Sequence, residues 1–139
     1  MTKNLFVFLL VAMALNGCSL DDDSTPVAYG YAAITEVDLP DSFEFGETYD
    51  IDITYSLNSD CFIFSGFDMI RGEPNSRTVR AVVEAFGSND CDDSLALPVE
   101  FTETLGFEVI FTEDYTFRFL TGIDEEGNET FLEYVVPVE

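Results

Sequence analysis

Hydrophobic and polar residues alternate along most of the chain after residue 28. The clearest stretch is Thr48 to Leu57, in which every second residue from Tyr49 onward is apolar and the residues between are Asp, Thr or Ser. A period of two turns one set of side chains toward a core and the other toward water, as in a half-buried β-strand. No segment keeps the helical spacing of three to four residues over a useful length. We therefore expect β-structure throughout, with an acidic, water-facing side on this strand.

Six further segments show a strand pattern: residues 31–39, 61–67, 78–86, 99–102 with 107–111, 115–121 and 131–138. The stretches between them are rich in Gly, Pro, Asn and Asp, which form turns. About seven short strands in one domain are typical of a Greek-key β-sandwich. The predicted fold class is all-β, a single antiparallel sandwich of about seven strands. A closed barrel of the same strands is the alternative.

The first 17 residues have the layout of an export signal. Lys3 precedes an apolar run from Leu5 to Leu15, and Asn16 and Gly17 lead into Cys18. A helix of this run would span about 16 Å, roughly half of the hydrocarbon thickness of a bilayer. A retained transmembrane anchor is therefore not expected, and residues 1–17 are predicted to be a signal peptide.

Leu15 to Cys18 resembles a lipobox, the motif at which bacterial lipoprotein signals are cut after acylation of the cysteine. Asn16 is a less usual residue at its position in the motif. The resemblance implies lipidation of Cys18 and a partnership with the membrane through a permanent lipid anchor. The alternative is a general secretion signal that is cut near a cysteine by chance.

Residues 18–28 are predicted to be the acylated cysteine and an acidic tether, followed by the sandwich domain at 29–139. Asp21 to Asp23 resembles the acidic export signal of surface lipoproteins of Bacteroidota, particularly flavobacteria, which implies a lipid-anchored protein of the outer membrane at the cell surface. A plain solvated linker, with retention in the inner leaflet, is the alternative. From Cys18 onward the chain resembles small uncharacterised flavobacterial lipoproteins, a group that implies no particular activity.

The balance of acidic and basic residues excludes several classes of function. The chain has 28 acidic residues against five basic ones, no histidine and a net charge of −23. Phosphate backbones are bound by clustered Lys and Arg, so nucleic acid is excluded as a partner. Histidine-dependent nucleophiles and the usual zinc and copper sites are excluded as well. A carboxylate pair of the glycosidase kind would need a cleft that a small domain with short loops hardly offers, and we expect no enzymatic activity.

Cys61 and Cys91 are the two cysteines that remain once Cys18 is acylated. An exported protein in an oxidising compartment is expected to pair them. A bridge closing about 30 residues would stabilise the fold by roughly 3–4 kcal/mol in the chain-entropy model. The spacing, and a chain without Trp, do not fit the disulfide framework of antibody domains.

Two acidic loops are candidate calcium sites, because calcium takes six to eight oxygen ligands from Asp, Glu, Asn and carbonyls. The candidates are Asn89, Asp90, Asp92 and Asp93 around Cys91, and Asp124, Glu126, Asn128 and Glu129 in the last hairpin. Neither follows the spacing of a known calcium loop. The alternative is a pair of solvated turns without a cofactor, with Gly127 and Asn128 supplying positive φ angles in the second.

The predicted domain has four basic residues, all of them arginines. We expect them to pair with neighbouring carboxylates. The alternative is a ligand-facing patch on the strand of Arg118, formed by Thr116, Arg118, Leu120 and Tyr134.

The segment Phe107 to Val138 resembles the last three strands of bacterial immunoglobulin-like and fibronectin-type modules. In these modules an aromatic residue shortly after a turn opens the penultimate strand, and Tyr115 holds that place. Its hydroxyl would bond to upstream backbone, or its ring would simply lie in the core. The resemblance implies an immunoglobulin-like sandwich.

Ser24 and Ser94 each follow an Asp, within Asp23-Ser24-Thr25 and Asp93-Ser94-Leu95. These tripeptides resemble the sites at which Bacteroidota attach O-linked glycans to exported proteins. Such short patterns also arise by chance in an Asp-rich chain.

Two function classes follow. The first is a surface-displayed, non-catalytic immunoglobulin-like module that binds an unknown protein or glycan or serves an envelope assembly. The alternative is a calcium-binding or envelope-structural lipoprotein whose acidic surface is itself the function.

Overall fold

The computed structural model describes residues 27–85, 90–92 and 94–139, and it is all-β. It contains seven strands and no helix in these ranges: β1 Tyr29–Asp38, β2 Thr48–Leu57, β3 Phe62–Gly72, β4 Ser76–Ala85, β5 Val99–Glu108, β6 Tyr115–Ile123 and β7 Glu129–Val136. The prediction of an all-β sandwich of about seven strands is confirmed. The signal peptide and most of the tether lie outside the described residues.

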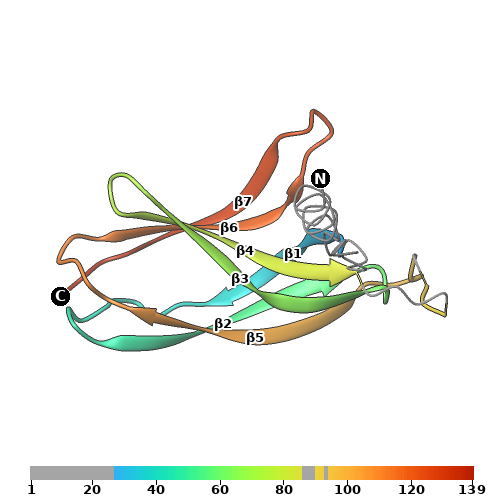
Figure 1. The fold of residues 1–139 in the computed structure, drawn as a ribbon. Coiled ribbons are helices and arrows are strands. Elements are labelled where there is room, and N and C mark those ends of the chain that lie inside the picture. Colours follow the sequence, from blue (N-terminus) through green and yellow to red (C-terminus); the bar gives the residue numbers. More distant parts are fainter. Residues whose placement is uncertain (1–26, 86–89, 93) are drawn as a thin grey trace, which may run out of the picture.

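The strands form two layers that are joined through β1 (Figure 1). The first half of β1 pairs with β4, and its second half pairs with β2, so that the pairing runs β5-β2-β1-β4-β6-β7 with β3 on the other edge of β4. A register shift between Ile34 and Glu36 interrupts the pairing of β1 with β2. Strands that change sheets in this way commonly bend at such irregularities.

The expectation of purely antiparallel pairing is wrong for one pair of strands. β4 and β6 are parallel over four residues, from Ser76 beside Thr116 to Val79 beside Phe119. After β4 the chain crosses to the other layer, runs back as β5 on the edge of β2, and then returns as β6. Two reversals bring β6 back in the direction of β4, which makes their contact parallel.

The strand at residues 99–108 is longer than its pattern indicates. Two short segments were expected there, but β5 is continuous and pairs with β2 from Val99 beside Leu57 to Glu108 beside Thr48. β5 is an edge strand, and most of its side chains are exposed. Only the last part of β5 is covered by the other layer, where Phe107 is buried and Leu105 half-buried, so its polar middle needs no alternation.

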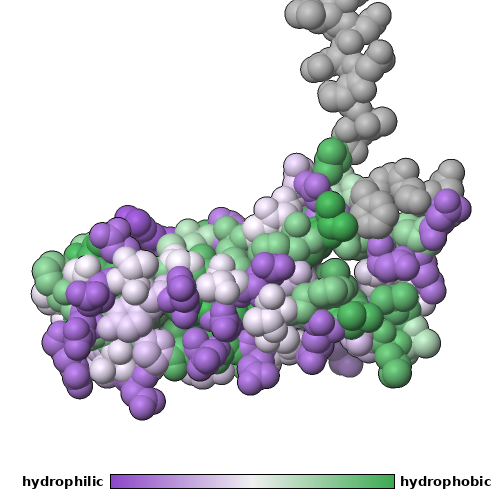
Figure 2. All heavy atoms as spheres, turned by 90° about the horizontal axis from the view of Figure 1, so that it is seen from below, coloured by the Kyte–Doolittle hydropathy of each residue, from purple (hydrophilic) through white to green (hydrophobic). Residues whose placement is uncertain are grey.

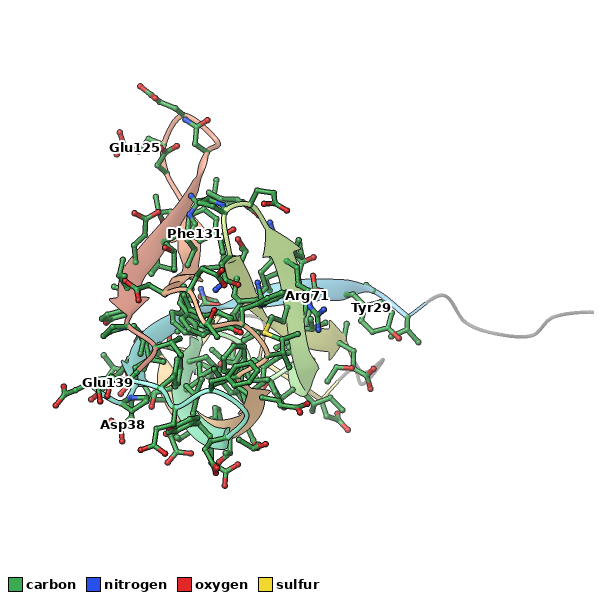
Figure 3. The ribbon with its side chains drawn as sticks, turned by 90° about the vertical axis from the view of Figure 1, so that its left-hand side faces the viewer. Tyr29, Asp38, Arg71, Glu125, Phe131 and Glu139 are labelled. Atoms are coloured by element: carbon green, nitrogen blue, oxygen red, sulfur yellow. A yellow bond between two sulfur atoms is a disulfide. The ribbon has the colours of Figure 1, made fainter. Side chains whose placement is uncertain are left out.

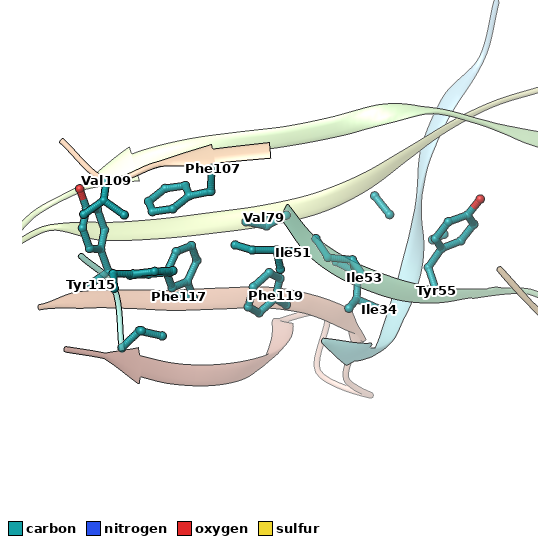
Figure 4. Close-up of a cluster of buried hydrophobic side chains, with 14 of the residues drawn as sticks. Ile34, Ile51, Ile53, Tyr55, Val79, Phe107, Val109, Tyr115, Phe117 and Phe119 are labelled. Atoms are coloured by element: carbon teal, nitrogen blue, oxygen red, sulfur yellow. The ribbon is translucent and has the colours of Figure 1, made fainter. Parts of the chain in front are cut away.

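The core lies between the layers and follows the alternation of the strands (Figure 4). In β2 the apolar residues Ile51, Ile53 and Tyr55 are buried while Asp50 and Asp52 are exposed, as predicted. Aromatic rings of β6 and its neighbours fill one end of the core: Phe43, Phe107, Tyr115, Phe117 and Phe119.

The outer side of the β2–β5 layer is mixed in polarity. Figure 2 shows hydrophilic side chains along much of it and hydrophobic ones gathered toward the end at which the chain enters β1. Leu97, Val99 and Phe101 are among the exposed apolar residues of β5 and the segment before it. The opposite end of the molecule carries the β3–β4 hairpin tip (Figure 1).

Candidate functional site

A pocket of about 390 Å³ lies at the β3–β4 hairpin tip, between this tip and the segment that follows β5. Figure 3 looks onto this end of the molecule and labels Arg71 on the hairpin. The lining includes charged, amide and aromatic side chains: Arg71, Glu73, Asn75, Arg77, Phe111 and Glu113. Two of the five basic residues of the chain therefore lie in one pocket.

Arg77 occupies a core-facing position of β4. It has the same parity as Val79, Ala81 and Val83, which are all buried, and only 2% of its own surface is exposed. One guanidinium nitrogen, Nη1, donates a hydrogen bond of 2.7 Å to the Ser76 carbonyl oxygen. The guanidinium carbon lies 5.0 Å from the centroid of the Tyr115 ring, within the range of a cation–π contact.

The charge of Arg77 has no acidic partner within ion-pair distance in the described part of the chain. Burial lowers the pKa of its guanidinium; Tyr115 opposes this shift and Arg71 adds to it. An arginine stays charged at any physiological pH. The pocket is therefore built around a desolvated cation that aromatic rings and a carbonyl hold in place.

The hairpin tip fixes the other side of the pocket. Arg71 pairs directly with Arg77 across the ladder, and Asn75 takes a φ of 81°, a left-handed conformation common for Asn in turns. The Asn75 amide nitrogen, Nδ2, donates to the carbonyl oxygens of Glu113 and Asp114 at 3.0 and 3.1 Å. The amide oxygen, Oδ1, is buried and accepts no hydrogen bond within the described residues.

Sequence reasoning missed Arg77 as a site residue. The expectation that the arginines pair with carboxylates is confirmed for Arg80, which bonds to Glu129 at 2.8 Å, and for Arg118, which bonds to Glu133 at 2.8 Å. It is wrong for Arg71 and Arg77, neither of which has a carboxylate within ion-pair distance among the described residues. The alternation of β4 could have indicated this role. Arg77 occupies the same alternate positions as the buried apolar residues of its strand, whereas Arg80 occupies the other set.

The alternative patch around Arg118 is not formed as expected. Tyr134 lies opposite Phe117 and contacts the Phe119 ring, on the core side of β6 rather than beside Arg118. Leu120 is buried. The guanidinium of Arg118 lies 4.0 Å from the centroid of the Phe131 ring and is already paired with Glu133.

The predicted disulfide is present. Cys61 and Cys91 are bonded, with their Cα atoms 5.0 Å apart, and tie the start of β3 to the segment between β4 and β5. The Asp60 carboxylate lies close to both sulfurs. Because the two sulfurs are bonded to each other, they are not free thiolate ligands for a metal.

In each of the two loops, one aspartate carboxylate bonds to the backbone of its own turn. The Asp92 carboxylate accepts from the Ser94 amide at 3.0 Å, and the Asp124 carboxylate accepts from the amides of Glu126 and Asn128 at 2.9 and 2.8 Å. Gly127 has a φ of 88°, whereas Asn128, contrary to expectation, has no positive φ. Asn89 and Asp93 lie outside the described residues.

Among the described residues, neither calcium candidate loop brings three acidic side chains within ligand distance of one another. Calcium binding through Asp90, Asp92, Asp124, Glu126 and Asn128 stays a prediction. The modification sites Cys18 and Ser24 lie outside the described residues, and Ser94 is exposed. Within the described ranges, no helix has the length and apolar character to cross a membrane.

No family model, curated protein or solved structure matches this chain. The chemistry of the pocket therefore carries the functional argument.

Proposed function

We propose that this chain is a membrane-anchored lipoprotein of the outer membrane, displayed at the cell surface, and that its sandwich is a non-catalytic binding module. The binding end is the pocket at the β3–β4 hairpin tip. The observation that carries the proposal is the placement of this pocket at the end of the domain away from the tether.

The two ends are separated along β4. Tyr29, where the chain enters the sandwich, pairs with Glu84 near the end of β4, whereas Arg77 lies at the beginning of that strand. Glu84 lies seven positions after Arg77 along the extended strand, which corresponds to about 23 Å. Figure 1 shows the start of β1 and the hairpin tip at opposite ends. An anchor at Cys18 would hold the pocket outward.

The chemistry of the pocket favours binding over catalysis. Guanidinium groups such as those of Arg71 and Arg77 are suited to binding anions, whereas acid–base catalysis typically uses imidazole, carboxyl or amine groups. Glu73 and Glu113 are exposed and supply negative charge at the rim. Fixed charges of both signs around a small concave site are suited to orienting a ligand.

The anchor is tested by the variant Cys18→Ala, with Ser19→Ala as the matched control. We expect Cys18→Ala to move the protein from the membrane fraction to the soluble fraction, while Ser19→Ala stays with the membrane. Protease added to intact cells tests display. The surface proposal requires loss of the domain from intact cells, and a protein that is cut only after lysis contradicts it.

A further inference from the structure

The arginine pocket carries balanced charge in a strongly acidic chain. Its lining holds two arginines and two glutamates, whereas the whole chain has a net charge of −23. Neither arginine has a carboxylate within ion-pair distance in the described residues. Neither positive charge of the pocket is therefore neutralised by an ion pair within the described residues, and Arg71 is exposed whereas Arg77 is buried.

We propose that the pocket binds a small zwitterion, a free α-amino acid with an apolar side chain. Its carboxylate would bind Arg71 and Arg77, and its ammonium group would face Glu73 and Glu113. This inference rests on the proposed binding function and names the ligand class of the same site.

The buried guanidinium supports the carboxylate end. An arginine has five N–H donors, and the hydrogen bond from Arg77 to the Ser76 carbonyl uses one nitrogen. Its planar fork matches a carboxylate, and such charge-assisted bonds are among the strongest in proteins. A desolvated cation without an anion is costly, so an incoming carboxylate relieves a penalty that the folded protein already carries.

The rim supports the ammonium end. Asn75 Oδ1 is a buried acceptor without a donor in the described residues, and an ammonium group has three donors to offer. The Asn75 amide nitrogen is held by two carbonyl oxygens, so the orientation of the oxygen is fixed as well. Glu73 and Glu113 add negative charge to the lining of the same pocket.

The size and polarity of the pocket fit a small ligand with an apolar part. Pro74 and Phe111 contribute apolar lining, and Phe111 is 43% exposed. A volume of about 390 Å³ lies at the lower end of the range for small-molecule sites. It accommodates one amino acid more readily than an extended polymer.

The net negative charge of the protein favours the approach of a zwitterion over that of an anion. A chain of charge −23 repels acidic glycans, phosphate and other anions as they approach. A zwitterion has no net charge and is not repelled at long range, yet it presents a carboxylate at short range. A zwitterion is therefore not repelled by the net negative charge of the protein, and the pocket offers charged groups of both signs to bind it.

The test is isothermal titration of the protein purified from membranes in detergent, as the full processed chain. The probes are L-leucine, N-acetyl-L-leucine, L-leucinamide and phosphoethanolamine. We expect L-leucine to bind, and removal of the ammonium charge or of the carboxylate to weaken binding at least about tenfold. Equal binding of the three leucine compounds, or tighter binding of phosphoethanolamine, overturns the amino-acid assignment.

Two exposed positions supply the variants, because Arg77 is buried and its removal could unfold the domain. Arg71→Gln and Glu113→Gln are each expected to weaken L-leucine binding at least about tenfold, and Arg118→Gln, on an ion pair elsewhere, to leave it unchanged. Equal loss in the Arg118→Gln control overturns the site. If L-leucine does not bind the wild type while Cys18→Ala still leaves the membrane, the ligand class is wrong and the anchor stands.

Discussion

Tyr115 shows how one side chain joins a turn to the core. Its ring is fully buried against Phe107 and Phe117, and its hydroxyl accepts hydrogen bonds from the amides of Ile110 and Phe111 at 3.1 and 3.0 Å. Both roles considered for Tyr115 from the sequence, the backbone bond and the core aromatic, are confirmed. The residue fixes the segment between β5 and β6, which also forms one wall of the arginine pocket.

Removing this hydroxyl should destabilise the domain without changing the fold. Tyr115→Phe keeps the ring but leaves two backbone amides without their acceptor, for which we expect a loss of about 1–3 kcal/mol in the free energy of unfolding. Urea unfolding of the variant and the wild type measures it. The control is Tyr134→Phe, at a partly exposed ring, and an equal loss in both variants would contradict the role of the Tyr115 hydroxyl.

Residues that break the pattern were the least predictable. Phe43 lies between strands, where the sequence indicates only a turn, yet it is fully buried and its ring contacts Tyr49, Phe107 and Tyr115. An isolated bridge to Val138 holds it there. The burial of Phe43 depends on contacts with residues distant in sequence, so the local pattern of apolar and polar residues does not predict it.

At the scale of elements, the β6–β7 hairpin is closed by Asp124. Hydrogen bonds from the Asn128 backbone amide, and with smaller effect from the Asn128 side chain and from the Glu126 and Gly127 amides, lower the pKa of the Asp124 carboxyl below its ordinary value. Desolvation opposes the shift only in part. The carboxylate acts as a cap for its own turn.

This pKa direction predicts how the hairpin responds to pH. A carboxyl whose pKa is lower in the folded than in the unfolded state stabilises the fold at neutral pH, and this stabilisation is lost as the pH falls through the folded pKa. We expect Asp124→Ala to melt below the wild type at pH 7, with the difference shrinking in acid. Glu125→Ala, in the same turn, is the control. A difference between wild type and Asp124→Ala that does not depend on pH would contradict the cap.

Most of the strands could be predicted because the alternation of apolar and polar residues that defines their buried face is visible within each segment of the sequence. β2 was predicted with its observed bounds, and β1, β4, β6 and β7 within a few residues. The continuity of β5 and the parallel contact of β4 with β6 could not be predicted, because they depend on which strands become neighbours. The disulfide was predictable from the count of cysteines, whereas the pocket required the hairpin tip and the segment after β5 to meet.

At the scale of the molecule, the net charge of −23 should make the fold sensitive to salt. Like charges repel one another in the compact state, and salt screens the repulsion. Raising NaCl from low to moderate concentration should raise Tm by about 4–8 °C, the equivalent of roughly 1 kcal/mol. Thermal unfolding followed by circular dichroism measures this, and an unchanged Tm contradicts it.

The same melting experiment addresses the calcium alternative. General screening predicts equal shifts for calcium and magnesium at matched ionic strength, since Debye screening does not distinguish the ions. A larger shift with calcium would favour a specific site in the acidic loops. Asp124→Ala and an Asp92→Ala variant would then show which loop provides it.

The central claim, an exported sandwich held at a membrane through Cys18, is tested most directly by the intact mass of the membrane-extracted protein, measured with and without reduction. The account predicts a mass equal to residues 18–139 plus acyl chains, with a gain of two hydrogens when the Cys61–Cys91 bond is reduced. A mass without acyl chains, or one that retains residues 1–17, would contradict it.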